Sequence, residues 1–424
     1  MSGISRAAVL AAYLQVRRRR FADREELLAW QRPRLRRALH RARGRFAYYR
    51  DLPGAGLADF PELDRAAWLA GFDRLNDRGL TLEQCLAAAR QAEAGRQFDT
   101  ALRGLSVGLS SGTSGAQGAF LTSPAERARW AGSILAKALP GGLLAGARVA
   151  LALRAGGPLY AAVDGGRVSF RFVDLYAGLP AQAAALAAYR PTVLAAPPVL
   201  LDLLATERLA GRLPIAPALV YSIADVLDPD VEARIAAGFG VRVGQVYQAT
   251  EGFLGITCDH GRLHLNEDLV VVERRDLGEG RFVPVVTDLY RTSQAVIRYR
   301  MGDVAVAAGP CACGSPMQAV ARVEGRADDV LLLRRADGST GHCYADLVRS
   351  LVLGVPGVAD FQLVQQAPDR LVLAADPAGG WPAAAAALRQ GLAAAGFAVP
   401  EVAEGGFAPP DPTSKRRRVS RAWR

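Results

Sequence analysis

The feature that most constrains the fold of this chain is an alternation of short apolar runs with alanine-rich stretches, which begins near residue 105. The runs "ARVALAL" (147–153) and "PTVLAAP" (191–197) are typical of buried strands, whereas "PAQAAALAAYR" (180–190) and "DPDVEARIAAGFG" (228–240) are typical of helices. Strands that alternate with helices in this way form layered α/β domains. The sequence therefore predicts an α/β fold.

The two ends of the chain have a different texture. An arginine-rich opening within residues 1–50, which includes "WQRPRLRRALHRARGRFAYYR", carries apolar residues at helical spacing and is predicted to be helical. Residues 262–307 have the pattern of strands and turns, and the segment after "GRADD" (325–329) is a small mixed region with one alanine-rich helix. We expect a large N-terminal α/β layered domain over residues 1–325 and a small, mobile α+β C-terminal domain over residues 326–424.

Composition and charge narrow the class of protein. The chain is 50% hydrophobic and 22% charged, which is ordinary for a globular protein, and no apolar run reaches the roughly eighteen residues of a membrane span. The opening lacks the cleavage pattern of a signal peptide, so we expect a cytoplasmic protein. The net charge of +11 attracts anions, but the arginines are scattered and their short runs at 17–20 and 416–418 are not interleaved with aromatic residues. Anionic small molecules such as nucleotides are therefore the expected partners, rather than a nucleic acid or a membrane.

The first chemical motif is the loop "LSSGTSGAQGAF" at residues 109–120. Its hydroxyls, glycines and backbone amides suit the wrapping of phosphate oxygens. It is not the usual P-loop, because no Gly-Lys-Ser/Thr follows it. Taken alone, the same composition fits a flexible linker equally well.

The second motif, "VYQATEG" (246–252), follows a predicted strand. It places Thr250 and Glu251 at the rim where ligands of α/β proteins bind, and the carboxylate suits an Mg²⁺ ion held against a triphosphate. A helix N-cap box is the structural alternative. "VIRYRMGD", which ends at Asp303, and "GRADDVL", which begins at Gly325, come next, and each alone is an ordinary turn. The functional interpretation rests on the order and intervals of all four motifs.

Together, "SSGTSG", "YQATEG", "RYRMGD", "GRADDVL" and a lone lysine near the C-terminus resemble the motifs of the acyl-adenylate-forming superfamily. That superfamily contains acyl-CoA synthetases, peptide-synthetase adenylation domains and luciferases. The opening, "LHLNED" and "TSQAVIRYRMGD" look most like its phenylacetate–CoA ligase branch, to which deazaflavin-coenzyme adenylating synthetases also belong. The chain departs from many relatives at Gln117, where they carry a lysine in the phosphate loop.

The resemblance assigns nucleotide-binding roles to the first two motifs and to "SIADVLDP" (222–229). Ala224 and Asp225 correspond to a small-acidic pair beside the adenine, and Tyr247 and Gln248 would complete that slot. The loop residues that would hold the β- and γ-phosphates are Ser110, Ser111, Gly112, Thr113, Ser114 and Gly115.

The resemblance also assigns residues to the binding of Mg²⁺, to the binding of the ribose and to the hinge between the two domains. Thr250 would contact the α-phosphate of ATP and Glu251 the Mg²⁺ ion. Asp303 would accept both ribose hydroxyls, and Arg326 would approach the ribose or a phosphate. Asp328 would be the hinge about which the C-terminal domain turns.

The activity that the resemblance implies is ATP-dependent conversion of a carboxylic acid to an acyl adenylate, with release of pyrophosphate. The acyl group would then pass to a thiol, either coenzyme A or the phosphopantetheine of an acyl-carrier protein. An aryl or medium-length acyl acid is expected, and the candidate pocket segments "RAGGPLYAAV", "AAPPVL" and "YSIAD" are apolar and small. Two alternatives stay open, a nucleotidyltransferase that adenylates a coenzyme and a non-enzymatic nucleotide-binding protein.

One basic residue needs a separate explanation. Among 52 basic residues only two are lysines, Lys137 and Lys415, and Lys415 stands beside three arginines. The superfamily places its adenylation lysine at the position of Lys415. A compact ammonium on a flexible stem can follow charge as it moves between the attacking carboxylate and the α-phosphate, whereas a guanidinium fork is bulkier and more rigid. We therefore expect Lys415 to be catalytic.

The cysteines suggest a metal site. "TCDHGRLH" and "GPCACGSP" bring three of the five cysteines and two histidines into neighbouring strand regions. Three thiolates and one imidazole satisfy a tetrahedral zinc ion. The predicted ligands are Cys258, His264, Cys311 and Cys313, with His260 as the competing fourth ligand. Reduced thiols without a metal are the structural alternative.

Overall fold

The computed structural model of the chain describes residues 4–94, 100–109, 118–153 and 167–423. The chain divides into two compact units, Met1–Met301 with Val306–Arg322 and Gly302–Ala305 with Val323–Arg424. The boundary expected after residue 325 differs from this division, which also assigns Gly302–Ala305 to the second unit. Within the described residues, no helix has the length and apolarity needed to cross a membrane.

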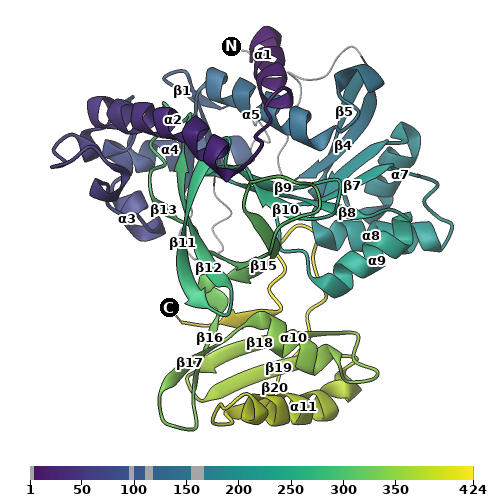
Figure 1. The fold of residues 1–424 in the computed structure, drawn as a ribbon. Helices are drawn as coiled ribbons and strands as arrows, with labels where there is room; N and C mark the ends of the chain where they lie inside the picture. Colours follow the sequence, from purple (N-terminus) through teal and green to yellow (C-terminus); the bar gives the residue numbers. More distant parts are fainter. Residues whose placement is uncertain (1–3, 95–99, 110–117, 154–166, 424) are drawn as a thin grey trace. The chain divides into compact units, whose positions relative to one another are not determined.

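The first unit opens with helices, as expected from its sequence (Figure 1). The second of them starts where the Asp23 carboxylate accepts a hydrogen bond from the backbone N–H of Glu26 at 2.9 Å, which satisfies a donor left unpaired at a helix start. The helices are α1 (Arg6–Arg17), α2 (Arg24–Arg45), α3 (Arg65–Ala70), α4 (Leu82–Ala94) and α5 (Pro124–Ala138). A small antiparallel sheet comprises β1 (Ala101–Leu102), β2 (Leu105–Leu109) and β3 (Ala119–Thr122).

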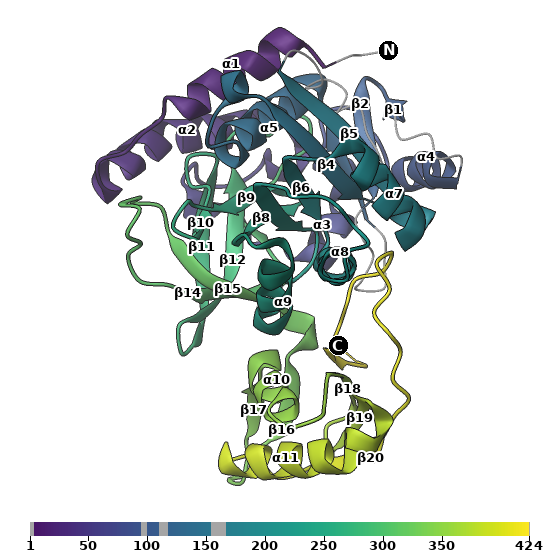
Figure 2. The same cartoon turned by 90° about the vertical axis from the view of Figure 1, so that its right-hand side faces the viewer.

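The largest sheet among the described residues has twelve strands, and five neighbouring strands of it, all in the first unit, run parallel (Figures 1 and 2). These are β4 (Ala147–Leu153), β5 (Val168–Asp174), β6 (Val193–Ala196), β7 (Leu219–Ile223) and β8 (Val243–Ala249). Their connecting helices are α7 (Leu179–Tyr189), α8 (Pro198–Leu209) and α9 (Pro229–Phe239). Leu186, Leu200 and Ile235 from the three helices are fully buried with Leu194 of β6 in one apolar core. This is the α/β arrangement predicted from the alternating pattern, and the fold class is confirmed.

The remaining strands extend the sheet beyond β8 in the order β11-β12-β14-β15-β10-β9-β8. β10 pairs antiparallel with both β9 and β15, which brings two cysteine-containing segments to one place in the sheet. The strands are β9 (Gly252–Thr257), β10 (Leu263–Leu265), β11 (Val270–Gly278), β12 (Arg281–Asp288), β13 (Tyr299–Arg300), β14 (Asp303–Ala307) and β15 (Ala319–Arg326).

The second unit packs two helices against a four-stranded sheet of order β20-β19-β18-β21. Phe361 and Leu363 of β18 are fully buried in its core with Leu388 of the alanine-rich helix. β21 pairs parallel with β18. The elements are β16 (Leu331–Arg334), β17 (Thr340–Cys343), α10 (Ala345–Leu353), β18 (Asp360–Ala367), β19 (Arg370–Asp376), α11 (Trp381–Ala394), β20 (Glu401–Glu404) and β21 (Val419–Arg421).

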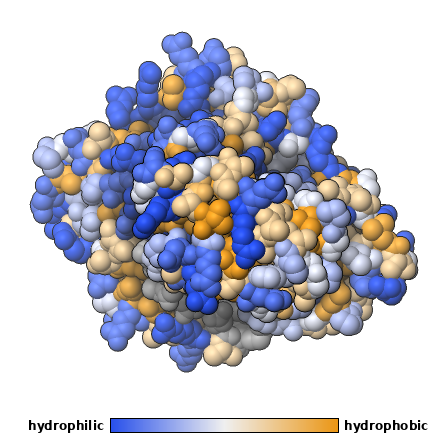
Figure 3. Space-filling view, turned by 90° about the horizontal axis from the view of Figure 1, so that it is seen from below, coloured by the Kyte–Doolittle hydropathy of each residue, from blue (hydrophilic) through white to orange (hydrophobic). Residues whose placement is uncertain are grey.

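The surface matches the scattered charge of the sequence. On the face drawn in Figure 3, hydrophilic residues are spread widely and apolar residues lie in small separate groups between them.

Candidate active site

The carboxyl ends of the parallel strands form the edge at which ligands of open α/β sheets bind. β7 ends at Ile223, and the next residue, Ala224, has a left-handed backbone conformation with φ of 66°. A residue with a Cβ atom is strained in that conformation, and such strain concentrates at functional sites. The backbone N–H of Asp225 donates to the Ile223 oxygen at 2.8 Å, and its carboxylate accepts the N–H of Val226 at 2.9 Å. The pair predicted to lie beside adenine therefore sits in a constrained turn at the binding edge.

Thr250 and Glu251 form the tip of a hairpin on the neighbouring strand. β8 and β9 pair antiparallel with the residues on either side of this pair opposite each other, so the two residues make a two-residue turn. The strand register shifts between Tyr247 and Gln248, which is a β-bulge of the kind common next to active sites. The helix N-cap alternative is wrong, because the chain continues into β9 rather than into a helix.

The two motifs are neighbours in the sheet. β7 and β8 pair parallel with Ile223 opposite Val246, so Ala224 and Tyr247 follow at the same level. The phosphate-loop residues Ser110, Ser111, Gly112, Thr113, Ser114 and Gly115, together with Gln117, lie outside the described residues. Leu109 and Ala119, which flank that loop, are paired in the β2–β3 ladder. The loop therefore begins and ends at adjacent positions.

Three further predicted residues lie in the second unit. Asp303 is the first residue of β14, and Arg326 is the last residue of β15. The backbone N–H of Ala327 donates to the Gly302 oxygen at 2.7 Å, and a Cβ atom at Gly302 would lie 2.6 Å from the Arg326 guanidinium. Asp303 and Arg326 are therefore brought close together. Asp328 lies just beyond them, in a short 3-10 helix at Ala327–Asp329.

Lys415 lies in the segment that leads into β21. The three arginines after it are all ion-paired within the second unit, Arg416 and Arg418 with Asp360 and Arg417 with Asp329. The half-buried Lys415 itself makes no ion pair or hydrogen bond with any residue that the structure describes. Among the described residues, Lys415 therefore differs from the three arginines that follow it, each of which has an acidic partner.

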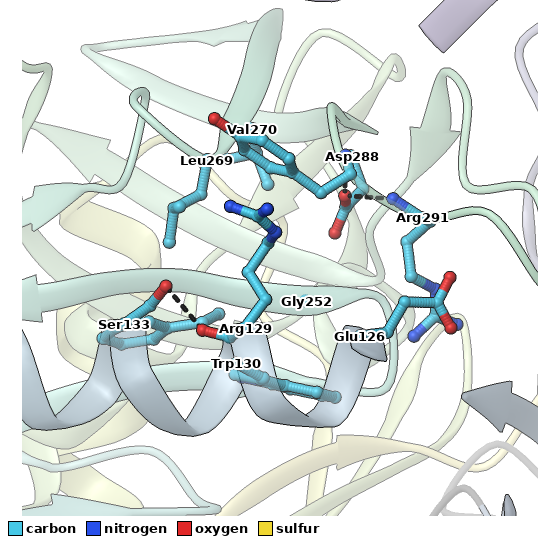
Figure 4. Close-up of a pocket in the computed structure, with 11 residues that line it drawn as sticks. Glu126, Arg129, Trp130, Ser133, Gly252, Leu269, Val270, Asp288 and Arg291 are labelled. Carbon is cyan, nitrogen blue, oxygen red and sulfur yellow. Dashed lines mark hydrogen bonds between the residues drawn. The ribbon is translucent and has the colours of Figure 1, made fainter. Parts of the chain in front are cut away.

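A pocket in the first unit lies between α5 and the strands beyond β8 (Figure 4). Gly252, which follows the Thr250–Glu251 tip, belongs to its wall. Arg129 of α5 projects into the pocket and lies 4.3 Å from the centre of the Tyr290 ring, a cation–π contact. Its lining residues are Glu126, Arg129, Trp130, Ser133, Gly252, Phe253, Leu269, Val270, Asp288, Tyr290 and Arg291.

Glu126 ties one wall of this pocket together. Its carboxylate accepts the backbone N–H groups of Ser123 at 2.6 Å and Ser293 at 2.9 Å, and the Ser293 hydroxyl at 2.5 Å. Burial alone would raise the pKa of Glu126, but the Arg291 charge and these hydrogen bonds lower it to about 2. Burial raises the pKa of nearby Asp288, although Arg291 opposes this shift. The pKa values of the two carboxyl groups of the pocket therefore shift in opposite directions.

The cysteine cluster is a second site in the first unit. The ligand atoms of Cys258, His264, Cys311 and Cys313 all lie within 4.8 Å of one another. Cys258 Sγ lies 3.7 Å from Cys311 Sγ, and Cys313 Sγ lies 3.4 Å from His264 Nε2. Tetrahedral zinc with bonds of about 2.3 Å to sulfur and about 2.0 Å to nitrogen requires edges of roughly 3.8 Å and 3.5 Å. The four side chains therefore have the spacing of a zinc site.

The orientation of His264 supports the same interpretation. Its Nδ1 lies 3.2 Å from the Met317 carbonyl oxygen, so Nδ1 carries the hydrogen and Nε2 is left as the ligand atom. His260, the competing ligand, lies in the turn between β9 and β10 and is exposed. Burial opposes ionisation of Cys311, but hydrogen bonds from Cys313 and His264 lower its pKa to about 6, whereas burial raises the pKa of the neighbouring Cys313 to about 11.

Sequence reasoning did not identify Glu126, Asp288 or Arg291. A local signal was present for Glu126, because Ser123-x-x-Glu126 is a capping box at the start of α5 and both of its hydrogen bonds form. No local signal connects Glu126 with Ser293, which is 167 residues further along the chain.

Comparisons with known protein families and with curated protein sequences return no match. Among solved structures, the chain is similar to 2-hydroxyisobutyryl-CoA ligase in its postadenylation state in complex with R3-HIB-AMP. The TM-score with that structure is 0.64, with 18% sequence identity, and the match covers 91% of this chain and 87% of the ligase chain. It is also similar to the acyl acid amido synthetase GH3.15, with a TM-score of 0.56 and 12% identity over 85% and 82% of the two chains. The amide bond synthetase McbA from Marinactinospora thermotolerans matches with a TM-score of 0.52 and 17% identity over 74% and 67%. The chain therefore shares the fold of adenylate-forming ligases.

Proposed function

We propose that this protein is an adenylate-forming ligase that activates a carboxylic acid with ATP and transfers the acyl group to a thiol. The observation that supports this most directly is the shared binding edge, where the strained Ala224 turn and the Thr250–Glu251 hairpin lie on neighbouring strands. The fold is shared with ligases whose structures contain acyl-AMP intermediates and coenzyme A. A sheet edge of this kind binds nucleotides in many α/β proteins.

In the first step a carboxylate oxygen of the acid attacks the α-phosphorus of ATP. The bond between that phosphorus and pyrophosphate breaks, which leaves an acyl adenylate. Ala224, Asp225, Tyr247 and Gln248 would hold the adenine, and Asp303 and Arg326 the ribose. Glu251 at the hairpin tip presents a carboxylate that suits Mg²⁺, which would neutralise the phosphate charge, and Thr250 and Lys415 would stabilise the charge at the α-phosphate.

In the second step a thiol attacks the acyl carbon, AMP leaves, and the thiol proton passes to solvent or to a base. The neighbour 2-hydroxyisobutyryl-CoA ligase binds both an acyl adenylate and coenzyme A, which supports coenzyme A as the acceptor over a carrier protein. The acid is proposed to be an aryl or medium-length acyl acid, and the phenylacetate–CoA ligase branch is the proposed relationship.

The test is ATP–pyrophosphate exchange screened over a library of carboxylic acids, followed by thiol acceptors with the acid that responds. Glu251→Gln should lower exchange at least ~100-fold, because it removes the carboxylate proposed to hold Mg²⁺. Glu401→Gln is the matched control, since Glu401 is exposed in β20. Absence of exchange with every acid would instead favour adenylation of a coenzyme, the second candidate function.

We further propose that two-step chemistry uses a hinge at Asp328, about which the C-terminal residues turn between the steps. Asp328 lies in the short 3-10 helix Ala327–Asp329, which directly follows β15 in the chain. Asp328→Pro fixes one backbone angle and should impair one half-reaction more than the other. Equal loss of both half-reactions in folded protein would contradict the hinge.

We also propose that Cys258, His264, Cys311 and Cys313 hold a structural zinc ion. The support is the tetrahedral spacing of their ligand atoms and the orientation of His264 by the Met317 carbonyl. Such an ion would fasten the β9–β10 turn to the segment before β15 and would take no part in the chemistry.

Metal analysis of protein purified without added zinc tests this site, and about one zinc per chain is expected. His264→Ala should lose the metal, whereas His260→Ala, which changes the neighbouring exposed histidine, should retain it. Well-folded protein with far less than one zinc per chain would eliminate the site.

A further inference from the structure

The segment around Lys415 is held by an unusual arrangement of charges. Arg416 and Arg418 both pair with Asp360 at the start of β18, and the Arg418 Nε–Asp360 Oδ1 distance is 2.9 Å. Arg417, which lies between them, pairs instead with Asp329. Neighbouring arginines therefore reach different partners, Asp360 on β18 and Asp329 in the 3-10 helix. The three arginines therefore attach the segment after Lys415 to two points of the second unit, Asp360 and Asp329.

The partner of Arg417 belongs to the proposed hinge. Asp329 directly follows Asp328 and is the last residue of the 3-10 helix Ala327–Asp329. Its carboxylate receives two hydrogen bonds from the same guanidinium, Arg417 Nε to Oδ2 at 3.0 Å and Arg417 Nη2 to Oδ1. The Asp329 side chain is 10% exposed, whereas the Arg417 side chain is 37% exposed. A two-pronged, charge-assisted contact of this kind fixes direction as well as distance.

We propose that the Asp329–Arg417 pair, named here the hinge clamp, is a positioning device that ties the Lys415 segment to the hinge. In this proposal Arg417 and Asp329 act through Lys415 rather than on a reacting atom, so both are positioning residues. The clamp joins residues 88 positions apart in sequence, one beside the hinge residue and the other two residues after Lys415. This inference rests on the proposed function, because it assigns the clamp a role in adenylation.

The physical reason is that a lysine side chain is long and flexible. Its ammonium reaches the charged oxygens at the α-phosphate reproducibly only if the backbone that carries it is held in place. Misplacement of a catalytic group by about 1 Å can lower a rate about 100-fold. Strand β21 holds the chain from Val419 onward through its parallel pairing with β18. The clamp extends that support towards Lys415 and fixes it to the segment about which the unit is proposed to turn.

The activity test measures the two half-reactions in Arg417→Ala, Asp329→Asn and the double variant. Each single variant should lower the kcat of adenylation about 10-fold or more, with the KM for ATP changed less than about twofold and thioester formation from presynthesised acyl adenylate unchanged. The double variant should be no worse than either single one, because both break the same contact. Arg334→Ala is the matched control, since Arg334 is exposed in the same unit and no ion pair of it is found among the described residues.

A second readout needs no activity. Hydrogen exchange measured on the full-length chain should increase in residues 411–419 when Asp329→Asn is introduced, and in residues 326–331 when Arg417→Ala is introduced, but in neither segment for Arg334→Ala. Unchanged exchange in both segments overturns the clamp even if the parent protein has no adenylation activity. If exchange increases but the parent protein has no adenylation activity, the contact of the hinge clamp is supported and only the proposed function is refuted. Increased exchange with unchanged adenylation in an active parent overturns the positioning role.

Discussion

The two lysines of this chain lie in opposite surroundings. In the first unit, Lys137 of α5 places its ammonium 2.9 Å from Oδ1 of the buried Asp268, whose other oxygen lies 2.8 Å from Arg19. In the second unit, Lys415 follows a turn, precedes three ion-paired arginines and makes no such contact within the described residues. One lysine is held by a buried carboxylate, and the other has no ion-pair partner in the part of the chain that the structure describes.

The two surroundings give separate reasons for a lysine in a chain that otherwise uses arginine. The Asp268 side chain is 1% exposed and pairs with two cations, so a small second cation fits there best. At Lys415 the proposed adenylation needs a cation that moves with its ligand, and a rotatable ammonium does this better than a planar fork. Lys137 is expected to matter for stability and Lys415 for activity.

The largest expected effect is on catalysis at Lys415. Lys415→Ala and Lys415→Arg should each lower adenylation at least ~100-fold, which is about 2.7 kcal/mol of transition-state stabilisation, because neither side chain can follow the shifting charge. Thioester formation from presynthesised acyl adenylate should be largely retained. Both half-reactions are measured, together with the free energy of unfolding, which should change by less than about 0.5 kcal/mol. Near-normal adenylation by Lys415→Arg would show that the lysine is only part of a charged tail.

The next effect is on stability at Lys137. Lys137→Ala leaves the buried Asp268 carboxylate with Arg19 as its remaining cation and should lower the free energy of unfolding by about 2 to 4 kcal/mol. Denaturant unfolding measures this change, and adenylation per folded molecule should stay within about twofold of the parent. Arg18→Ala, an exposed change at the end of α1, is the control and should cost less than about 0.5 kcal/mol. Equal stability of Lys137→Ala and the parent would refute the enclosed role.

The same comparison shows what the sequence could predict. The alternating pattern was sufficient for the α/β sheet, and the strand ahead of "ATEG" located the Thr250–Glu251 tip correctly at a strand end. The motif "LHLNED" was noted only for its resemblance, yet Asp268 within it pairs with Lys137 of α5 and with Arg19, which lies just after α1. Its partners are 249 and 131 residues away in sequence, and only tertiary packing brings them together.

The cysteine cluster shows the same limit at smaller scale. The sequence predicted three thiols with His264 as the fourth ligand and His260 as its competitor, but it offered no geometry for that preference. The strand register supports it, because β10 pairs with β15 so that His264 lies opposite Ala319, and its ligand atom lies with those of Cys311 and Cys313. His260 is exposed in the turn between β9 and β10.

Acid should narrow the difference between parent and Lys137→Ala. Burial opposes ionisation of Asp268, but Lys137 and Arg19 lower its pKa below the ordinary value of 3.8. A depressed carboxyl pKa contributes stability that is fully present above pH 3.8 and is lost as the pH falls through the folded-state pKa. The gap in unfolding free energy between parent and Lys137→Ala should therefore shrink below about pH 4, and unfolding at pH 7, 5 and 3 measures it. A gap that stays constant over this range would show that Asp268 is not its source.

The smallest expected effect belongs to Lys137→Arg, which keeps the charge and changes only size. A guanidinium at this position must fit beside that of Arg19, which already donates to both Oδ2 and the backbone oxygen of Asp268. Crowding in a packed site costs about 1 to 3 kcal/mol, and retained charge offsets part of it, so a loss of about 1 kcal/mol is expected. Unfolding of the variant beside Lys137→Ala isolates the contribution of size from that of charge. If Lys137→Arg is as stable as the parent, size does not explain this lysine, and the survival of Lys415 can no longer be argued by analogy with it.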